Sequence, residues 1–251
     1  MLKKIIENKR KEVNLAKKSI PLDSFKSKII NSNRNFKKAV LKNKLSLIAE
    51  FKRKSPSKNI QEKEFDIKKI INIYNQYADA ISVLTNEKFF NGSLDDMKAV
   101  SNLTSLPILR KDFIIDKYQI YEARLYNADA ILLIASILSL EQINDFIDIA
   151  KSFEMNCLVE IHNEQELNKI LHSKAEIIGI NNRNLDTLKI DLNTTLRLSD
   201  KIPSNKIIVS ESGIKYNDYV NKIKNKVNAI LVGSAFMNSN NIENEIIRLT
   251  K

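Results

Sequence analysis

Lysines and glutamates directly follow several short apolar runs of this 251-residue sequence, and these residue types could perform acid–base chemistry. A lysine ammonium donates a proton or binds an anion, and a glutamate carboxylate accepts a proton. A single such residue would usually only end a strand at the surface. Because burying unpaired charges is costly, their repetition in equivalent places favours a functional site made of Glu50, Lys52, Lys111, Glu160 and Glu211.

Glycines follow the last two apolar runs, in Glu211-Ser212-Gly213 and Gly233-Ser234. A glycine after a strand is most often a turn residue. However, glycine also lets the backbone approach an anion closely, and backbone N–H groups of such loops bind phosphate in many barrels. The joint placement of the two dipeptides favours the phosphate interpretation.

The apolar runs predict eight strands that are covered on both faces. Each run is short, rich in Ile, Val and Leu, and continuous rather than alternating with polar residues. Their starts lie 20 to 35 residues apart, which leaves room for one crossover helix each. The predicted strands are 45–52, 80–85, 107–111, 130–134, 157–160, 177–181, 207–211 and 229–232.

Eight strand–helix units without a hairpin signal predict an α/β fold, a single (β/α)8 TIM barrel. The alternative, a doubly wound open sheet, usually has a Gly-rich turn after its first strand, and this sequence has none. Active sites of barrels lie at the carboxyl ends of the strands. Side-chain alternation then turns the polar strand ends inward with apolar residues of the same face: Ile48 with Glu50 and Lys52, Leu109 with Lys111, Leu158 with Glu160, Gly179 with Asn181, and Val209 with Glu211.

Residues 1–44 are expected to form an N-terminal helical extension that packs on a barrel of residues 45–251. Apolar residues at helical spacing predict one helix that ends before Pro21, and a second helical piece is expected over 23–31. Later helix starts are marked by a capping residue with Glu or Gln three places on: Asp116 with Gln119, Ser139 with Gln142, and Asn163 with Glu166.

The net charge of +11 is concentrated at the N-terminus. Residues 1–58 hold 18 Lys or Arg against 4 Asp or Glu, whereas the remaining 193 residues hold 23 against 26. Such a segment could bind a polyanion or steer an anionic substrate. Its amphipathic pattern, without a dense basic block, instead favours a solvated helical extension. We therefore expect no nucleic acid as a partner.

The composition also limits the compartment and the cofactors. No run approaches the ~18 apolar residues of a membrane span, and no signal peptide is visible, so we expect a cytoplasmic protein without membrane contact. Cys157 is the single cysteine, and its position out of step with Glu160 predicts a core thiol that faces the helices. With only two histidines we expect no metal site, and His162 is interpreted as a loop or capping residue.

Six longer stretches of the chain are specific enough to be compared with known families. They are IAEFKRKSPS (48–57), ISVLTNEKFFNGS (81–93), LRKDFIID (109–116), LVEIH (158–162), IGINNRNL (178–185) and SESGI (210–214). In this order they resemble indole-3-glycerol phosphate synthase, a ribulose-phosphate-binding barrel of tryptophan biosynthesis. The small departures, such as Asn59 where glycine is frequent and Lys117 where proline is common, leave every catalytic residue type in place.

The resemblance implies a carboxy-lyase that converts 1-(2-carboxyphenylamino)-1-deoxyribulose 5-phosphate to indole-3-glycerol phosphate without a cofactor. It implies that Lys111 protonates the ketone oxygen during ring closure and that Glu160 is the base of the dehydration. Lys52, held by Glu50, is implied as an acid or as an anchor of the substrate carboxylate. The division of the dehydration between Lys52, Glu50 and Lys111 stays open. Paired Lys and Glu at a partly buried rim are expected to move one another's pKa toward neutrality.

The resemblance assigns the remaining site residues to substrate binding. Asn181 and Glu211 would orient hydroxyl groups, and Arg183 and Ser212 would hold the anthranilate or ribulose portion. The apolar wall around the aromatic ring is implied to be Phe89, Phe113 and Leu185. The implied phosphate site consists of Gly213, Gly233 and Ser234, with help from Lys52 or Ser55.

The expected partner is thus a phosphorylated small molecule. We expect a monomer, with association with other tryptophan-pathway enzymes as a further expectation, and a loop at 53–58 that closes over the substrate. Two other functions stay open. Another phosphate-binding barrel such as phosphoribosylanthranilate isomerase would need a cysteine and aspartate pair at strand ends, and Cys157 has the wrong parity. A basic RNA-binding or scaffolding protein would bind RNA in a salt-sensitive way and would not need Lys111.

Overall fold

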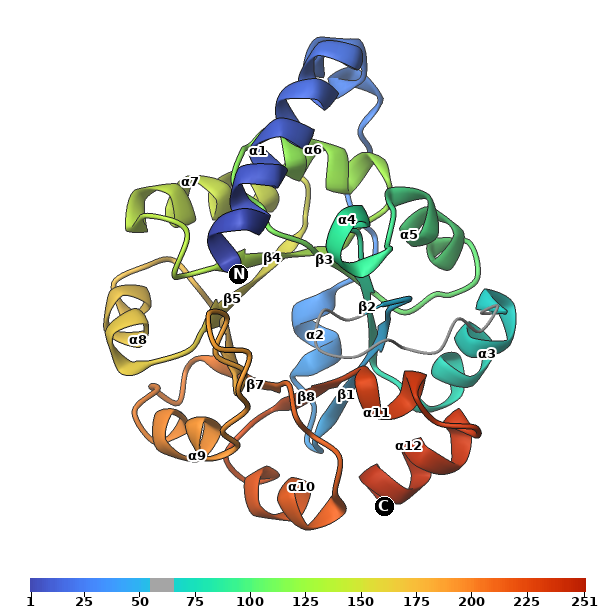
Figure 1. The fold of residues 1–251 in the computed structure, drawn as a ribbon, viewed down its shortest axis with the longest axis vertical. Coiled ribbons are helices and arrows are strands. Elements are labelled where there is room, and N and C mark those ends of the chain that lie inside the picture. The colour runs from blue at the N-terminus through green and yellow to red at the C-terminus, as the bar shows by residue number, and fades with distance from the viewer. Residues whose placement is uncertain (55–65) are drawn as a thin grey trace.

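Eight parallel strands form one closed barrel in the computed structural model, which describes residues 1–54 and 66–251. Each strand pairs with the next one in the chain, and the first pairs with the last (Figure 1). The predicted (β/α)8 TIM barrel is therefore confirmed. All predicted strands are present, four of them with the predicted bounds: β1 Ser46–Phe51, β2 Ala80–Leu84, β3 Ile108–Lys111, β4 Ala130–Ile134, β5 Asn156–Ile161, β6 Ile177–Asn181, β7 Ile207–Glu211 and β8 Ala229–Val232.

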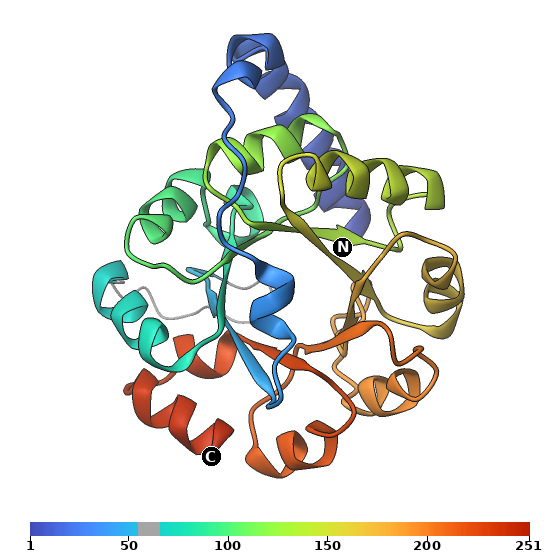
Figure 2. The ribbon, with the colours of Figure 1, turned by 180° about the vertical axis from the view of Figure 1, so that it is seen from behind.

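Helices surround the barrel on the outside, as both views of the ribbon show (Figures 1 and 2). The complete capping box of Ser139 with Gln142 and the cap of Asn163 on the Glu166 N–H are confirmed. The pair of Asp116 with Gln119 is also present, since the Asp116 carboxylate accepts from the Tyr118 N–H and the Gln119 side chain accepts from the Asp116 N–H, although the helix itself begins only at Tyr118. The helices are α3 Ile67–Tyr77, α4 Glu87–Phe90, α5 Leu94–Ser101, α6 Tyr118–Leu125, α7 Leu140–Lys151, α8 Glu164–Leu171, α9 Asn193–Ser199, α10 Asn217–Ile223, α11 Ser234–Met237 and α12 Ile242–Thr250.

Apolar side chains form two layers, one inside the barrel and one between the barrel and its helices. Ile48, Leu109, Leu158 and Val209 belong to the inner layer, as side-chain alternation predicts. Cys157 belongs to the outer layer and is buried there, so the prediction that it faces the helices is confirmed. The polar residues at the strand ends therefore share the face of the inner layer.

The N-terminal segment contacts both ends of the barrel. Helix α1 (Leu2–Ser19) is confirmed and ends before Pro21, whereas the helix expected over 23–31 is replaced by two short 3-10 turns at Leu22–Ser24 and Lys26–Lys28. Helix α2 (Phe36–Val40) was not predicted. Its buried Phe36 and Val40 pack on residues at the strand starts, and Figure 2 shows α2 across that end of the barrel. In the described part of the chain, no helix combines the length and the apolar character that crossing a bilayer requires.

Candidate active site

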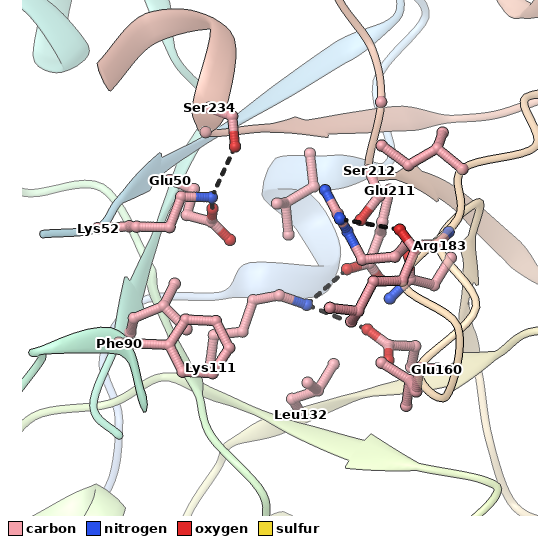
Figure 3. Close-up of a pocket in the computed structure, with 18 of the residues that line it drawn as sticks. Glu50, Lys52, Phe90, Lys111, Leu132, Glu160, Arg183, Glu211, Ser212 and Ser234 are labelled. Atoms are coloured by element: carbon pink, nitrogen blue, oxygen red, sulfur yellow. Dashed lines mark hydrogen bonds and ion pairs between the residues drawn. The ribbon is translucent and has the colours of Figure 1, made fainter. Parts of the chain in front are cut away.

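A cavity of about 320 Å³ opens at the carboxyl ends of the strands and collects the polar residues that end them (Figure 3). These residues come from five different strands or their ends, because each one continues the inward-facing side of its strand. Side chains that are far apart in the sequence thus meet in one place. The predicted residues that line the cavity here are Glu50, Lys52, Lys111, Glu160, Asn181 and Glu211.

The ammonium group of Lys111 lies between two carboxylates (Figure 3). Its Nζ is 2.7 Å from Oε2 of Glu211 and 3.1 Å from Oε2 of Glu160. Burial works to lower the pKa of Lys111, but the attraction of Glu160, Glu211 and Glu50 outweighs it and raises that pKa. Lys111 is therefore a fixed cation that can hydrogen-bond an oxygen of a bound molecule.

The two carboxylates around Lys111 differ in their proton affinity. Burial works to raise the pKa of Glu160, but Lys111, His162 and Asn181 outweigh it, so the pKa lies well below its usual range. For Glu211, burial and the neighbouring Glu160 raise the pKa to about 7 in spite of Lys111. The expectation that paired lysine and glutamate move toward neutrality is right for Glu211. It is wrong for Lys111 and Glu160, because opposite charges stabilise one another's charged forms.

Lys52 and Glu50 form a second ion pair in the same cavity. Nζ of Lys52 is 2.5 Å from Oε1 of Glu50 and donates to the Ser234 hydroxyl at 3.1 Å. Both side chains of the ion pair are buried. Lys52 therefore connects the end of β1 with the loop after β8, where the sequence suggested a phosphate site.

Two glycines leave the space that two of the site carboxylates occupy. A β-carbon on Gly179 would lie 2.2 Å from Oε1 of Glu211, and one on Gly233 would lie 2.1 Å from Oε1 of Glu50. Both separations are far below van der Waals contact. Gly213 has a different requirement, because its φ of +80° lies in the left-handed region that favours glycine.

An apolar wall faces the charged groups. Of the three residues expected there, Phe113 and Leu185 line the cavity, but Phe90 lines it in place of Phe89. The rings of Phe90 and Phe113 lie 6.4 Å apart between centroids. The motif that contains both phenylalanines did not show which of them faces inward, because α4, which carries them, is only four residues long.

Helix α1 also contributes to the cavity, which the sequence did not indicate. Leu2 and Ile5 line the cavity, and Lys9 forms a buried ion pair with Asp112, whose Oδ1 lies 3.0 Å from its Nζ. Asp112 directly follows Lys111. The helical spacing predicted the helix itself, but a sequence pattern does not tell which surface a helix covers.

The other predicted binding residues fall into two groups. Arg183, Ser212, Gly213, Gly233 and Ser234 all line the cavity. Ser55 lies outside the described residues, as does most of the loop at 53–58 that was expected to close over the substrate. His162 was interpreted as a loop or capping residue, yet its ring lies directly beside the carboxylate of Glu160.

The closed barrel and the charged groups at its carboxyl rim define a (β/α)8-barrel protein with an enzyme-type site. The family model described as indole-3-glycerol phosphate synthase matches residues 2–249. The chain belongs to the indole-3-glycerol phosphate synthase family.

Relatives of two lengths match this chain. It is 44% identical over 240 residues to the indole-3-glycerol phosphate synthase of Thermoanaerobacter pseudethanolicus, covering 94% of this chain and 92% of that one. It is 47% identical over 246 residues to the tryptophan biosynthesis protein TrpCF of Buchnera aphidicola subsp. Schizaphis graminum, covering 98% of this chain and 54% of the relative. The chain thus spans about half the length of the TrpCF relatives that it matches.

Solved structures with a similar fold have little sequence in common with this chain. A 3-hexulose-6-phosphate synthase superposes with a TM-score of 0.66 at 13% identity, covering 82% of this chain and 98% of that one. The thiamine phosphate pyrophosphorylase of Pyrococcus furiosus gives a TM-score of 0.61 at 17% identity, covering 82% and 94%. These likenesses concern the fold alone.

Proposed function

We propose that this chain closes the indole ring of 1-(2-carboxyphenylamino)-1-deoxyribulose 5-phosphate, releasing carbon dioxide and water and forming indole-3-glycerol phosphate. The observation that carries the proposal is Lys111 held between Glu160 and Glu211 in a cavity that also contains Lys52. Membership of the family suggests the reaction, and the cavity contains the groups that the reaction requires.

Ring closure needs a cation at the ketone oxygen of the substrate. The ring carbon that bears the carboxylate attacks the ketone carbon, and negative charge develops on the ketone oxygen. Lys111 is the proposed cation, and its contacts with Glu160 and Glu211 fix the direction of its N–H bonds. As the oxygen becomes the stronger base, a proton passes from Nζ and a hydroxyl forms. Carbon dioxide then leaves, and the electron pair of the broken bond restores the aromatic ring.

Dehydration needs an acid for the departing hydroxyl and a base for the proton that is lost. Glu160 is the proposed base, since the depression of its pKa keeps it ionised. Lys52, paired with Glu50, is proposed as the acid or as the anchor of the substrate carboxylate. Glu211 and Asn181 line the cavity beside Lys111, and they are proposed to hydrogen-bond the hydroxyl groups of the substrate.

The binding roles follow from the walls of the cavity. The proposed phosphate site is formed by Gly213, Gly233 and Ser234, with Lys52 beside it, at the loops after β7 and β8. The aromatic ring is proposed to lie against the apolar wall, and Arg183 and Ser212 contact the anthranilate or ribulose portion. Ser55 and the closing loop at 53–58 stay predictions.

The test is an assay with the synthetic substrate in which the fluorescence of the indole product is followed. The wild-type protein is expected to form the product, and Lys111→Ala is expected to lose at least ~100-fold in kcat. Lys117→Ala, on an exposed lysine before α6, is the matched control and should keep wild-type activity. Equal activity of wild type and Lys111→Ala would contradict the assigned role, and no product from the wild type would end the proposal.

The remaining expectations are proposals of the same kind. We propose residues 1–44 as an extension of a catalytic barrel of residues 45–251, and the monomer, the cytoplasmic location and the cofactor-free reaction stay predictions. The match to half of the TrpCF proteins supports a link to other tryptophan-pathway enzymes.

Phosphoribosylanthranilate isomerase activity is disfavoured because burial raises the pKa of Cys157, which faces the helices. RNA binding is disfavoured because it leaves the charged cavity without a purpose.

A further inference from the structure

The imidazole of His162 is buried between two glutamates, behind the wall of the cavity. It follows β5 and precedes α8, and its side chain is 8% exposed. Nδ1 lies 3.0 Å from Oε2 of Glu166, and Nε2 lies 3.2 Å from Oε1 of Glu160, although the latter contact lacks hydrogen-bond alignment. His162 itself does not line the cavity, so any effect on a bound molecule passes through Glu160.

The two contacts determine the charge of the ring. A neutral imidazole has one N–H group and one lone pair, so one of its nitrogens would lie beside a carboxylate oxygen without a proton. Only the imidazolium form carries a proton on both nitrogens and places a positive charge beside both carboxylates. Burial works to lower the pKa of His162, but Glu160 and Glu166 outweigh burial and raise it to about 10.

The charged groups around Glu160 explain why a second cation is needed there. Lys111 from β3 approaches one oxygen of Glu160 but is shared with Glu211 from β7, so one ammonium serves two carboxylates. The other oxygen of Glu160 faces His162, and the amide of Asn181 from β6 also favours the ionised form of this carboxylate. Glu166 from α8 completes the surroundings by holding the far side of the imidazole and its backbone N–H.

We propose that His162 is a positioning residue, which as an imidazolium holds the carboxylate of Glu160 in a fixed orientation and keeps it ionised. This inference rests on the proposed function, in which Glu160 is the base of the dehydration. Without the cation, Glu160 and Glu211 would compete for Lys111 alone. The pair would then take up a proton at higher pH, since coupled carboxylates titrate together.

The protonation state is measured without any substrate. The sequence has only two histidines, so the His172→Gln variant gives a single imidazole signal in a 15N-correlated NMR spectrum. We expect the signal to remain that of an imidazolium up to at least pH 8, and to titrate at lower pH when Glu166→Gln is added. A His162 ring that becomes neutral below pH 7 overturns the proposal.

The positioning role is measured by kinetics. His162→Gln is expected to lower kcat about tenfold at pH 7, with KM changed less than about twofold, because the ring does not touch the cavity. The acidic limb of its pH profile of kcat/KM should move upward by about one pH unit, which is at the lower end of the pKa shifts that a neighbouring charge produces. His172→Gln, on an exposed residue after α8, should match the wild type in both respects.

The outcomes separate the two proposals. A His162→Gln variant that loses activity equally at every pH, or only through lower thermal stability, overturns the positioning role while leaving the proposed reaction intact. A wild-type protein that forms no product contradicts the proposed function, whereas the NMR titration still decides whether His162 is the second cation beside Glu160.

Discussion

Gly179 and Glu211 lie on neighbouring strands, and the absence of a side chain on the glycine gives the carboxylate its place. A β-carbon at position 179 would lie 2.2 Å from Oε1 and 3.3 Å from Cδ of Glu211. The obstructing atoms belong to the far end of a flexible side chain, so a methyl group there would displace the carboxylate rather than the backbone. Gly179 therefore determines the position of the Glu211 carboxylate more than it affects the stability of the sheet.

Gly179→Ala should therefore reduce activity without preventing folding. Because Glu211 must move away from the methyl group, its contact with Lys111 is expected to be lost, and a displacement of about 1 Å costs up to ~100-fold in kcat. Steady-state kinetics measures the loss, and circular dichroism with urea titration measures the fold. In a Glu211→Ala background the same substitution should have almost no further effect, as a double-mutant cycle would show. An unchanged kcat in the single variant would contradict this relationship.

Asp112 should stabilise the fold above its own titration range. Burial works to raise its pKa, but Lys9 and Arg110 outweigh it and lower the pKa to about 2, compared with 3.8 in the unfolded chain. Because the folded pKa is the lower one, the stabilisation is present above about pH 4 and disappears as the pH falls toward 2. Asp112→Asn is expected to lower the free energy of unfolding by at least ~2 kcal/mol at pH 7, and by much less at pH 2.5. Urea titrations at both pH values test this, and a loss that is independent of pH would argue against it.

Phe36 should stabilise the end of the barrel that lies opposite the site. It is fully buried on α2 and packs on the starts of the strands. Phe36→Ala removes a ring from a closed apolar layer, and such changes lower the free energy of unfolding by about 3–5 kcal/mol. At a temperature where the variant is folded, kcat and KM should stay close to the wild-type values. Tyr216→Ala, on an exposed side chain, is the stability control, and equal losses in both variants would show that α2 does not close the barrel.

The barrel was predictable from the sequence because its strands are buried on both faces and read as continuous apolar runs. The inward direction of Glu50, Lys111 and Glu160 was predictable for a related reason, since alternation along a strand is rigid. α2 was not found, because a helix of five residues shows no period. The short 3-10 turns at 22–28 could not be predicted either, because a charged segment with scattered apolar residues is compatible with several backbone conformations.

Contacts between particular side chains could not be predicted from the sequence pattern, whether the residues are near or far apart in the chain. His162 follows Glu160 by two residues, so alternation would place it on the same inward face, but its partner Glu166 is visible only once α8 is in place. Likewise, no pattern connects Lys9 with Asp112. The proton affinities at the rim also depend on these contacts, because each ammonium has more than one carboxylate within reach. A sequence gives the residue types, whereas the three-dimensional neighbours determine which carboxylate is protonated.

Glu211 should therefore be the site carboxylate whose charge weakens the fold at neutral and alkaline pH. Burial outweighs the attraction of Lys111 and raises the pKa of Glu211 from 4.5 to about 7. A folded pKa above the unfolded one means that the stabilisation is complete below about pH 4.5 and is lost as the pH rises through 7. Glu211→Gln keeps the shape without the charge, so it should be more stable than the wild type at pH 8, by an amount on the order of 2 kcal/mol, and similar to it at pH 4.5. The same variant should lose activity, because the substrate hydroxyl and Lys111 lose a charged acceptor, as is common where a site is built at the expense of stability. Thermal unfolding at the two pH values tests the change in stability, and the fluorescence assay tests the loss of activity. A variant that is less stable than the wild type at pH 8 would mean that the contact with Lys111 outweighs the burial of the carboxylate.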